Sequence, residues 1–226
     1  PPGSYTMVQV FPKSANTLSK ASIVVAGIVL GTVGLATINI NRTTYVTTQS
    51  MPIEQVVQFT HTHHVGSLGL DCRFCHAAVE ESSYAGIPPS KTCMGCHSVV
   101  WKDAPILEPV RESFRNDTSV EWIKVHDLPE FVYFNHSIHV NKGIGCESCH
   151  GRVDKMPLMM RQNSLNMEWC LACHRAPEQF LRPKDQVFTM GWDPEKALGK
   201  TQAELGAELK AENHVQSRTN CATCHR

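Results

Sequence analysis

The sequence lacks most of the features that identify an enzyme or a nucleic-acid-binding protein. Its 226 residues carry 21 basic and 21 acidic side chains, so the formal net charge is zero and nothing indicates nucleic acid as a partner. Aromatic residues make up only 7% of the chain. It has no glycine-rich phosphate loop, and no nucleophile–base pair or carboxylate pair in a convincing setting. The cysteines, in contrast, follow a regular pattern in the sequence.

No cysteine lies outside a Cys-x-x-Cys-His motif. This spacing is the attachment site of a c-type haem, in which two thiols bind the porphyrin vinyl groups and the imidazole binds the iron. Zinc sites, redox pairs and disulfides also use paired cysteines, but none of them requires a histidine after every pair. The sequence therefore predicts five covalently attached haem c groups. Their motifs are Cys72, Cys75 and His76; Cys93, Cys96 and His97; Cys146, Cys149 and His150; Cys170, Cys173 and His174; and Cys221, Cys224 and His225.

The haem sites are too closely spaced to form separate domains. They lie within residues 59–226, a stretch of 168 residues or roughly 34 per haem. A domain of that size cannot bury a core of its own. We therefore expect a mainly helical and irregular multihaem cytochrome c with little or no sheet, in which the porphyrins supply much of the interior.

Residues 21–40 form an uncharged and mostly apolar run. Twenty helical residues span about 30 Å, the thickness of a bilayer core. A cleaved signal peptide is the alternative, but the run is long for one and no Ala-x-Ala site follows it. We predict a single transmembrane helix with residues 1–20 in the cytoplasm. Because haem c is attached outside the cytoplasmic membrane, residues 41–226 are expected on the periplasmic side.

The haem domain contains an internal repeat. The first cysteines of successive motifs are separated by 21, 53, 24 and 51 residues, so the repeating unit is a pair of haems. A Phe-x-His-x-x-His-Val pattern precedes the first and third motifs at a shift of 75 residues. The sequence predicts repeats at about 59–133 and 134–208, and a half-repeat at 209–226.

The repeats also indicate second axial ligands, because neutral imidazole binds iron well. Two histidines precede each complete pair, and they could share a helix face or serve different haems. The half-repeat retains one. The candidates are His61, His64, His136, His139 and His214. His126 or a methionine could replace His214, and His126 could instead bond a haem propionate. His63 breaks the repeat and is expected to be a surface or hydrogen-bonding residue.

Two helix starts are recognisable near the C-terminus. Asp193-Pro194 has a capping residue followed by proline in the first turn. Thr201 and Glu204 have the spacing of a capping box, and Leu205 and Leu209 would share one face of the following helix.

An iron with histidine on both faces has no open coordination position, so it can only gain or lose an electron. Two imidazoles also give a lower potential than a His/Met pair, which suits electrons from quinols. Five such centres held at a membrane favour an electron relay without a substrate site of its own.

The stretches WIKVHDLPEFVYFNHSIHVNKGIGCESCHGRV and NMEWCLACHRAPEQF, with one N-terminal apolar helix and five motifs, resemble the pentahaem subunit of alternative complex III, a quinol:electron-acceptor oxidoreductase. The resemblance covers essentially residues 20–226. Because the context of His126 lies within it, the resemblance supports His126 as a ligand, whereas the repeat supports His214.

This resemblance implies a set of partners. Electrons would come from menaquinol through an iron–sulfur, molybdoenzyme-like subunit and a multi-helix quinone-binding membrane subunit. They would leave through a monohaem cytochrome c to an oxidase, a soluble cytochrome or a blue-copper protein. The complex would lie in the inner membrane.

Two other functions are open. A stand-alone membrane-anchored quinol dehydrogenase that feeds a periplasmic reductase has a similar layout, but usually has a methionine two residues after its first motif histidine, where this chain has Ala78. A multihaem reductase would need an iron with an open position, and this chain has enough histidines to close all five.

Overall fold

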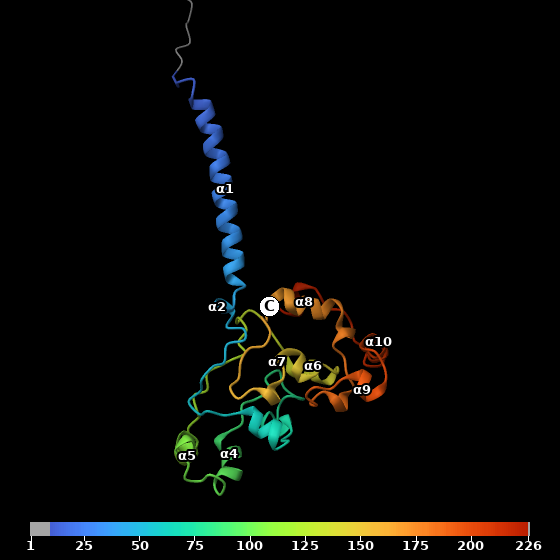
Figure 1. Cartoon of the computed structure of the whole chain (residues 1–226). Helices are drawn as coiled ribbons and strands as arrows, with labels where there is room; N and C mark the ends of the chain where they lie inside the picture. The colour runs from blue at the N-terminus through green and yellow to red at the C-terminus, as the bar shows by residue number, and fades with distance from the viewer. Residues whose placement is uncertain (1–9, 226) are drawn as a thin grey trace, which may run out of the picture. The chain divides into compact units, whose positions relative to one another are not determined.

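The computed structural model describes residues 10–225, so the first nine residues of the expected cytoplasmic segment lie outside the described part. The chain divides into two compact units, Pro1–Thr47 and Thr48–Arg226. Figure 1 shows both units, which are considered separately below.

The first unit is dominated by one long apolar helix. Helix α1 (Ala15–Asn41) has 27 residues, and the most apolar part of it has a mean hydropathy of 2.2. The helix begins six residues before the predicted apolar run at residues 21–40. Polar side chains such as Lys20 do not belong to the apolar run, but they are compatible with a helix. None of its residues is buried. A membrane span and a signal segment share these properties. A four-residue helix, α2 (Thr44–Thr47), follows.

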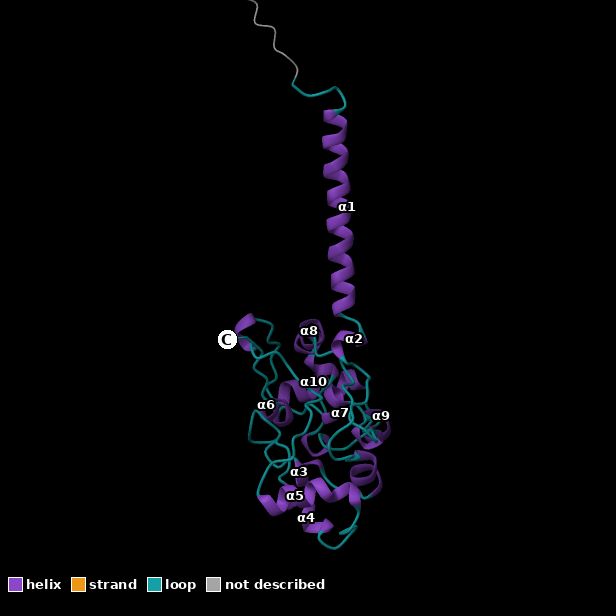
Figure 2. Ribbon diagram, turned by 90° about the vertical axis from the view of Figure 1, so that its left-hand side faces the viewer, coloured by secondary structure: helices purple, strands orange, loops and turns teal. Residues whose placement is uncertain are grey.

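The second unit is built from short helices joined by long irregular connections. Only isolated bridges, and no strands, occur among residues 10–225, as Figure 2 shows. The expected mainly helical and irregular fold without a sheet is thus confirmed. The helices are α3 (Cys72–Cys75), α4 (Ser90–His97), α5 (Glu108–Asn116), α6 (His136–Asn141), α7 (Cys146–His150), α8 (Met167–Arg175), α9 (Pro194–Leu198) and α10 (Gln202–Glu212), with a π-helical turn at Thr62–Ser67 and shorter 3-10 turns.

Most buried apolar side chains of the second unit form two small clusters instead of one core, and Val57, Val110 and Met156 lie outside both. The first contains Val79, Val140 and Val187, and the second contains Leu181, Leu205 and Leu209. Clusters of three residues are far smaller than the core that a domain of this length normally buries. The protein side chains alone therefore account for only part of an ordinary interior.

Both predicted helix starts near the C-terminus are confirmed. The Asp193 carboxylate accepts hydrogen bonds from the backbone of Glu195 and Lys196 at the start of α9. Thr201 and Glu204 form a reciprocal capping box at the start of α10. Helix α10 also packs tightly: a Cβ at Gly206 would overlap the carbonyl of Glu178.

We expect Thr201→Ala to lower the free energy of unfolding by about 1 kcal/mol, because it removes the side-chain acceptor for a backbone N–H of α10. Chemical denaturation followed by the haem Soret band measures this change. Glu212→Ala, at the other end of α10, is the control. It should cost nothing, because a carboxylate near a helix C-terminus gains nothing from the helix dipole. Equal losses in the two variants would contradict the assignment.

Candidate functional site

Each Cys-x-x-Cys-His motif is formed on a single helical turn. In chain order, motifs 1 to 4 lie on α3, α4, α7 and α8, and motif 5 lies on a 3-10 turn at Cys221–Thr223. Residues three apart on such a turn face the same side. The two thiols of each motif can therefore reach one porphyrin, with the histidine next to them.

The ten predicted attachment cysteines differ in exposure. Cys96 of motif 2 and Cys221 of motif 5 are exposed, whereas the other eight are partly buried. None of the five motif turns contains a buried residue of its own, so the difference depends on how far other segments cover each motif. An exposed thiol can still bind a vinyl group, and both residues remain predicted attachment sites.

Backbone carbonyls fix the orientation of four motif histidines. A ring nitrogen, Nδ1, lies within hydrogen-bonding distance of a carbonyl oxygen in each case. When Nδ1 donates to a carbonyl, Nε2 is the atom left to bind a metal. The contacts are His76 to Gly86 (2.6 Å), His97 to Val100 (3.0 Å), His174 to Arg218 (2.8 Å) and His225 to Phe131 (3.1 Å).

Three of the candidate distal histidines are held in the same way. His64 Nδ1 lies 2.9 Å from the Thr60 carbonyl oxygen, and His139 Nδ1 lies 2.7 Å from that of Asn135. These two contacts are equivalent within the predicted repeat. His136 Nδ1 lies 2.8 Å from the carbonyl oxygen of Ser83. These rings also leave Nε2 for a metal.

Two pairs of rings have the spacing that a shared iron requires. The ring centroids of His64 and His97 are 6.2 Å apart, and those of His139 and His174 are 6.1 Å apart. Metal–imidazole bonds are about 2 Å long, so two rings on opposite sides of one metal have centroids roughly 6 Å apart. The geometry therefore fits a haem iron between each pair.

Five imidazoles gather at the centre of the second unit. His150 lies 6.3 Å from His136 with the ring planes only 8° apart, and 4.3 Å from His126. The second distance is too short for two ligands on opposite sides of one iron. Burial, together with the neighbouring rings of His126, His136, His76 and His61, lowers the pKa of His150 to about 3. This ring is thus uncharged at neutral pH, as a metal ligand must be.

His61 and His126 each bury an unsatisfied ring nitrogen. His61 Nδ1 and His126 Nε2 have no hydrogen-bond partner. Burial lowers the pKa of both histidines to about 4, with His76 contributing to His61 and Arg161 to His126. A buried polar atom without a partner is costly. An iron or a porphyrin substituent would offset this cost, so both residues fit the expected group.

The remaining candidates lie apart from these rings. His214 is exposed and has a φ of 50°. His63 is also exposed, as expected, and its ring stacks on Trp101 with the centroids 6.4 Å apart. In the part of the chain that the structure describes, no ring contact joins His126 or His214 to His225.

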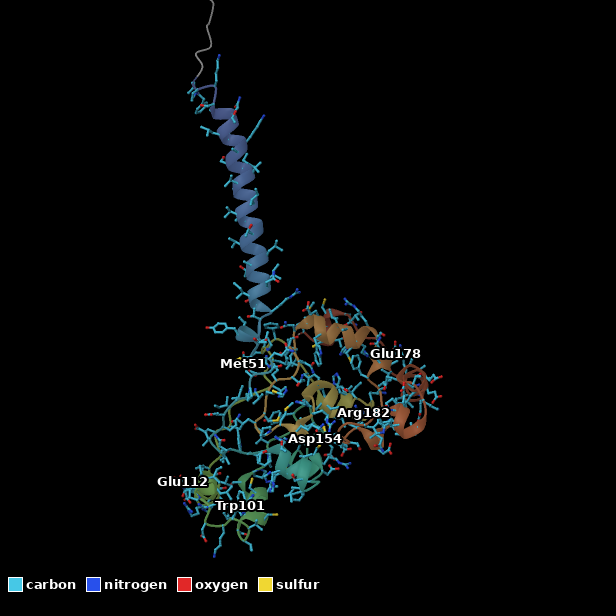
Figure 3. The ribbon with its side chains drawn as sticks, in the orientation of Figure 1. Met51, Trp101, Glu112, Asp154, Glu178 and Arg182 are labelled. Carbon is cyan, nitrogen blue, oxygen red and sulfur yellow. The ribbon has the colours of Figure 1, made fainter. Side chains whose placement is uncertain are left out.

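A buried ion pair beside motif 3 was not foreseen from the sequence. The Arg182 guanidinium donates to the Glu147 carboxylate at 2.7 Å, and the side chains are 9% and 14% exposed. The same carboxylate accepts from the Gly191 backbone, and Arg182 also donates to the Thr189 carbonyl. Figure 3 shows Arg182 in this part of the second unit. The only sequence signal for this ion pair is the charged residue Glu147 between Cys146 and Cys149.

Five haem-attachment turns on a helical, sheet-free unit define a multihaem cytochrome c with five haem c groups. Residues 132–226 match the family described as cytochrome c7 and related cytochrome c. The chain is therefore cytochrome c7-like over its last three motifs.

A curated relative identifies the group more closely. The chain is similar to the menaquinone reductase multiheme cytochrome c subunit of Nitratidesulfovibrio vulgaris (strain Hildenborough), with 35% identity over 98 residues. The match covers 43% of this chain and 46% of the relative, so it spans about half the length of that protein. The chain is thus distantly related to a multiheme cytochrome c subunit of a menaquinone reductase.

Proposed function

We propose that this chain passes electrons between a membrane quinol and a downstream acceptor, as the pentahaem subunit of an alternative complex III-like assembly. The observation that carries the proposal is the spacing of His64 from His97 and of His139 from His174, which suits an imidazole on each face of the iron. Irons closed in this way exchange single electrons and bind no substrate. The chain itself would then have no substrate site.

The remaining axial ligands are proposed from the same geometry and from the repeat. His136 faces His150 at 6.3 Å. His61 occupies the equivalent position in the first repeat, and its pKa responds to His76, so we pair these two. The ligand opposite His225 is then His126 or His214. His126 has a buried free nitrogen in its favour, and His214 has its place in the half-repeat.

The protein residues have three tasks in this proposal. The ten cysteines fix the porphyrins covalently, which holds them without a large apolar core. The backbone carbonyls that face Nδ1 of the histidines set the ring orientation and raise the basicity of Nε2. The bound haem supplies one-electron redox chemistry, and the polypeptide keeps each iron closed to other ligands.

The partners are proposed from the resemblance and from the relative. The relative is named as a subunit of a menaquinone reductase. For this chain we propose an iron–sulfur, molybdoenzyme-like subunit, multi-helix quinone-binding subunits and a monohaem cytochrome c. Electrons would run from menaquinol to a cytochrome, an oxidase or a copper protein.

We also propose that α1 remains attached and anchors the chain in the inner membrane. Its 27 residues exceed the roughly 20 that a bilayer core requires. Haem c is attached outside the cytoplasmic membrane, so the haem unit, within residues 41–226, lies on the periplasmic side, and residues 1–20 lie in the cytoplasm.

Gentle solubilisation and subunit analysis of the native membrane complex tests this function. We expect the chain to co-purify with a large iron–sulfur protein and multi-helix membrane subunits. The isolated chain should not oxidise quinol, because it has no open site for it. A lone chain that oxidises quinol by itself would support the stand-alone dehydrogenase instead, and an open, ligand-binding iron would support a reductase.

A further inference from the structure

We infer that the five motifs form one unbranched line in the order 2–1–3–4–5, so that motifs 2 and 5 are the two ends at which electrons enter and leave. This inference rests on the proposed electron-relay function. It differs from the order of the motifs in the sequence, in which motif 1 would be an end. The contacts between successive motifs carry it.

Motifs 2 and 1 are joined by one helical turn. His64, on the π-helical turn Thr62–Ser67, has its ring 6.2 Å from that of His97 in motif 2. The same turn runs directly into motif 1, because the Leu70 amide, two residues before Cys72, donates to the His64 carbonyl oxygen at 3.0 Å. His61, which we pair with His76 of motif 1, immediately precedes this turn.

Motifs 1 and 3 pack directly against each other. Val79, three residues after His76, belongs to the cluster that also contains Val140 and contacts Cys146 of motif 3. The backbone after motif 1 continues along this contact, because the amides of His136 and Ser137 donate to the carbonyls of Ser83 and Ser82.

Motifs 3 and 4 are joined by helix α6. His136 and His139 lie three residues apart on this helix, with His136 6.3 Å from His150 and His139 6.1 Å from His174.

Motif 5 is attached to motif 4 by the segment that precedes it. His174 Nδ1 lies 2.8 Å from the Arg218 carbonyl oxygen, and the Ser217 hydroxyl donates to the Arg175 carbonyl. Arg218 is three residues before Cys221. Each link in the line is therefore supported by a contact of its own.

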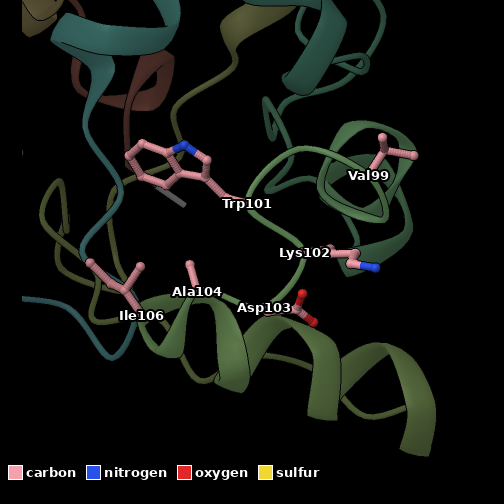
Figure 4. A pocket seen from close by; sticks show the side chains of 6 residues that line it. All are labelled: Val99, Trp101, Lys102, Asp103, Ala104 and Ile106. Carbon is pink, nitrogen blue, oxygen red and sulfur yellow. The ribbon is translucent and has the colours of Figure 1, made fainter.

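The two ends are separated within the second unit. In Figures 1 and 2, α4 lies at one end of this unit, and α8 and the C-terminal segment lie at the other. The exposed cysteines, Cys96 and Cys221, belong to these two end motifs. Beyond motif 2, the loop after α4 borders an open hollow of roughly 640 Å³ that partner chains can approach. It is lined by Val99, Trp101, Lys102, Asp103, Ala104 and Ile106 (Figure 4).

A redox titration that resolves the five haems in the detergent-solubilised full-length chain tests this order. His64→Met should change the reduction potential of the haem at motif 2. It should shift the reduction potential of only one other haem, because charge interactions weaken with distance. The matched variant His139→Met at motif 4 should change its own haem and shift two others. If His64→Met shifts two other haems, motif 2 is an interior member of the line and the inference is wrong.

The iron positions in the unmodified protein provide a second test that no folding defect can obscure. Anomalous scattering at the iron edge should show one near iron neighbour for motif 2 and two for motif 1. One neighbour for motif 1 and two for motif 2 would overturn the order. Neither measurement uses quinol, so a failure of the order is distinguishable from a failure of the proposed quinol oxidation.

Discussion

Replacing His139 by glycine is expected to open one iron of the five. The ring of His139 lies 6.1 Å from that of His174, and its Nδ1 faces a backbone carbonyl, which leaves Nε2 as an iron ligand. Without this ligand the haem at motif 4 becomes five-coordinate. We expect a high-spin ferric signal from one haem and binding of one equivalent of CO after reduction.

His63→Gly is the matched control, because the histidine is exposed and stacks on Trp101. Its ring also contacts that of His64, which is proposed to bind the iron of motif 2 and not that of motif 4. The control variant should give no high-spin signal and bind no CO. Mass measurement should find five haems in both variants, since no cysteine is changed. If the His139→Gly protein is low-spin and does not bind CO, another residue coordinates this iron. Exogenous imidazole should restore the low-spin signal.

Removing Arg182 is expected to cost about 3 kcal/mol of unfolding free energy, because it leaves the largely buried Glu147 carboxylate with only the more distant Arg152, at 3.9 Å, as a charged partner. The carboxylate is 14% exposed and receives the guanidinium at 2.7 Å. Arg182→Ala should therefore lower the midpoint of guanidinium unfolding strongly. Denaturation followed by the haem Soret band measures the loss.

Two further variants separate charge from packing. The double variant Arg182→Met/Glu147→Met should recover most of the stability, because it removes both buried charges. Lys196→Ala breaks an exposed pair with Asp193 and should cost no more than about 1 kcal/mol. If the double variant is as unstable as Arg182→Ala, the guanidinium stabilises the protein mainly through its hydrogen bonds to backbone carbonyls and not through the ion pair.

The sequence predicted the parts of this protein that depend on local chemistry. The Cys-x-x-Cys-His spacing determines the haem count, and the apolar run at residues 21–40 determines the long helix. The Thr201 capping box was also predictable, since its hydrogen bonds join residues three apart.

Long-range contacts were not predictable in this way. The ion pair of Glu147 with Arg182 joins residues 35 positions apart, and the contact of His174 with Arg218 joins residues 44 apart. Neither contact has a local signal, because the sequence does not distinguish a Glu or Arg in a long-range contact from one at the surface. The exposure of Cys96 could not be predicted either, since all five motifs have the same spacing whether or not other segments cover them. The spatial order of the motifs was also not predictable, because it depends on which motifs are joined by α6 and by the turn at Thr62–Ser67.

The attachment of motif 5 to residues 131–133 has a consequence for how the chain matures. Val132 bridges to His225, and the Tyr133 amide donates to the Cys224 carbonyl at 2.8 Å. This contact closes a loop of more than 90 residues and can form only after the last motif has crossed the membrane. Closing such a loop costs entropy before any packing repays it, which slows folding. Residues 131–133 therefore remain without this contact until motif 5 has been translocated, and motif 5 remains accessible for haem attachment until the contact forms.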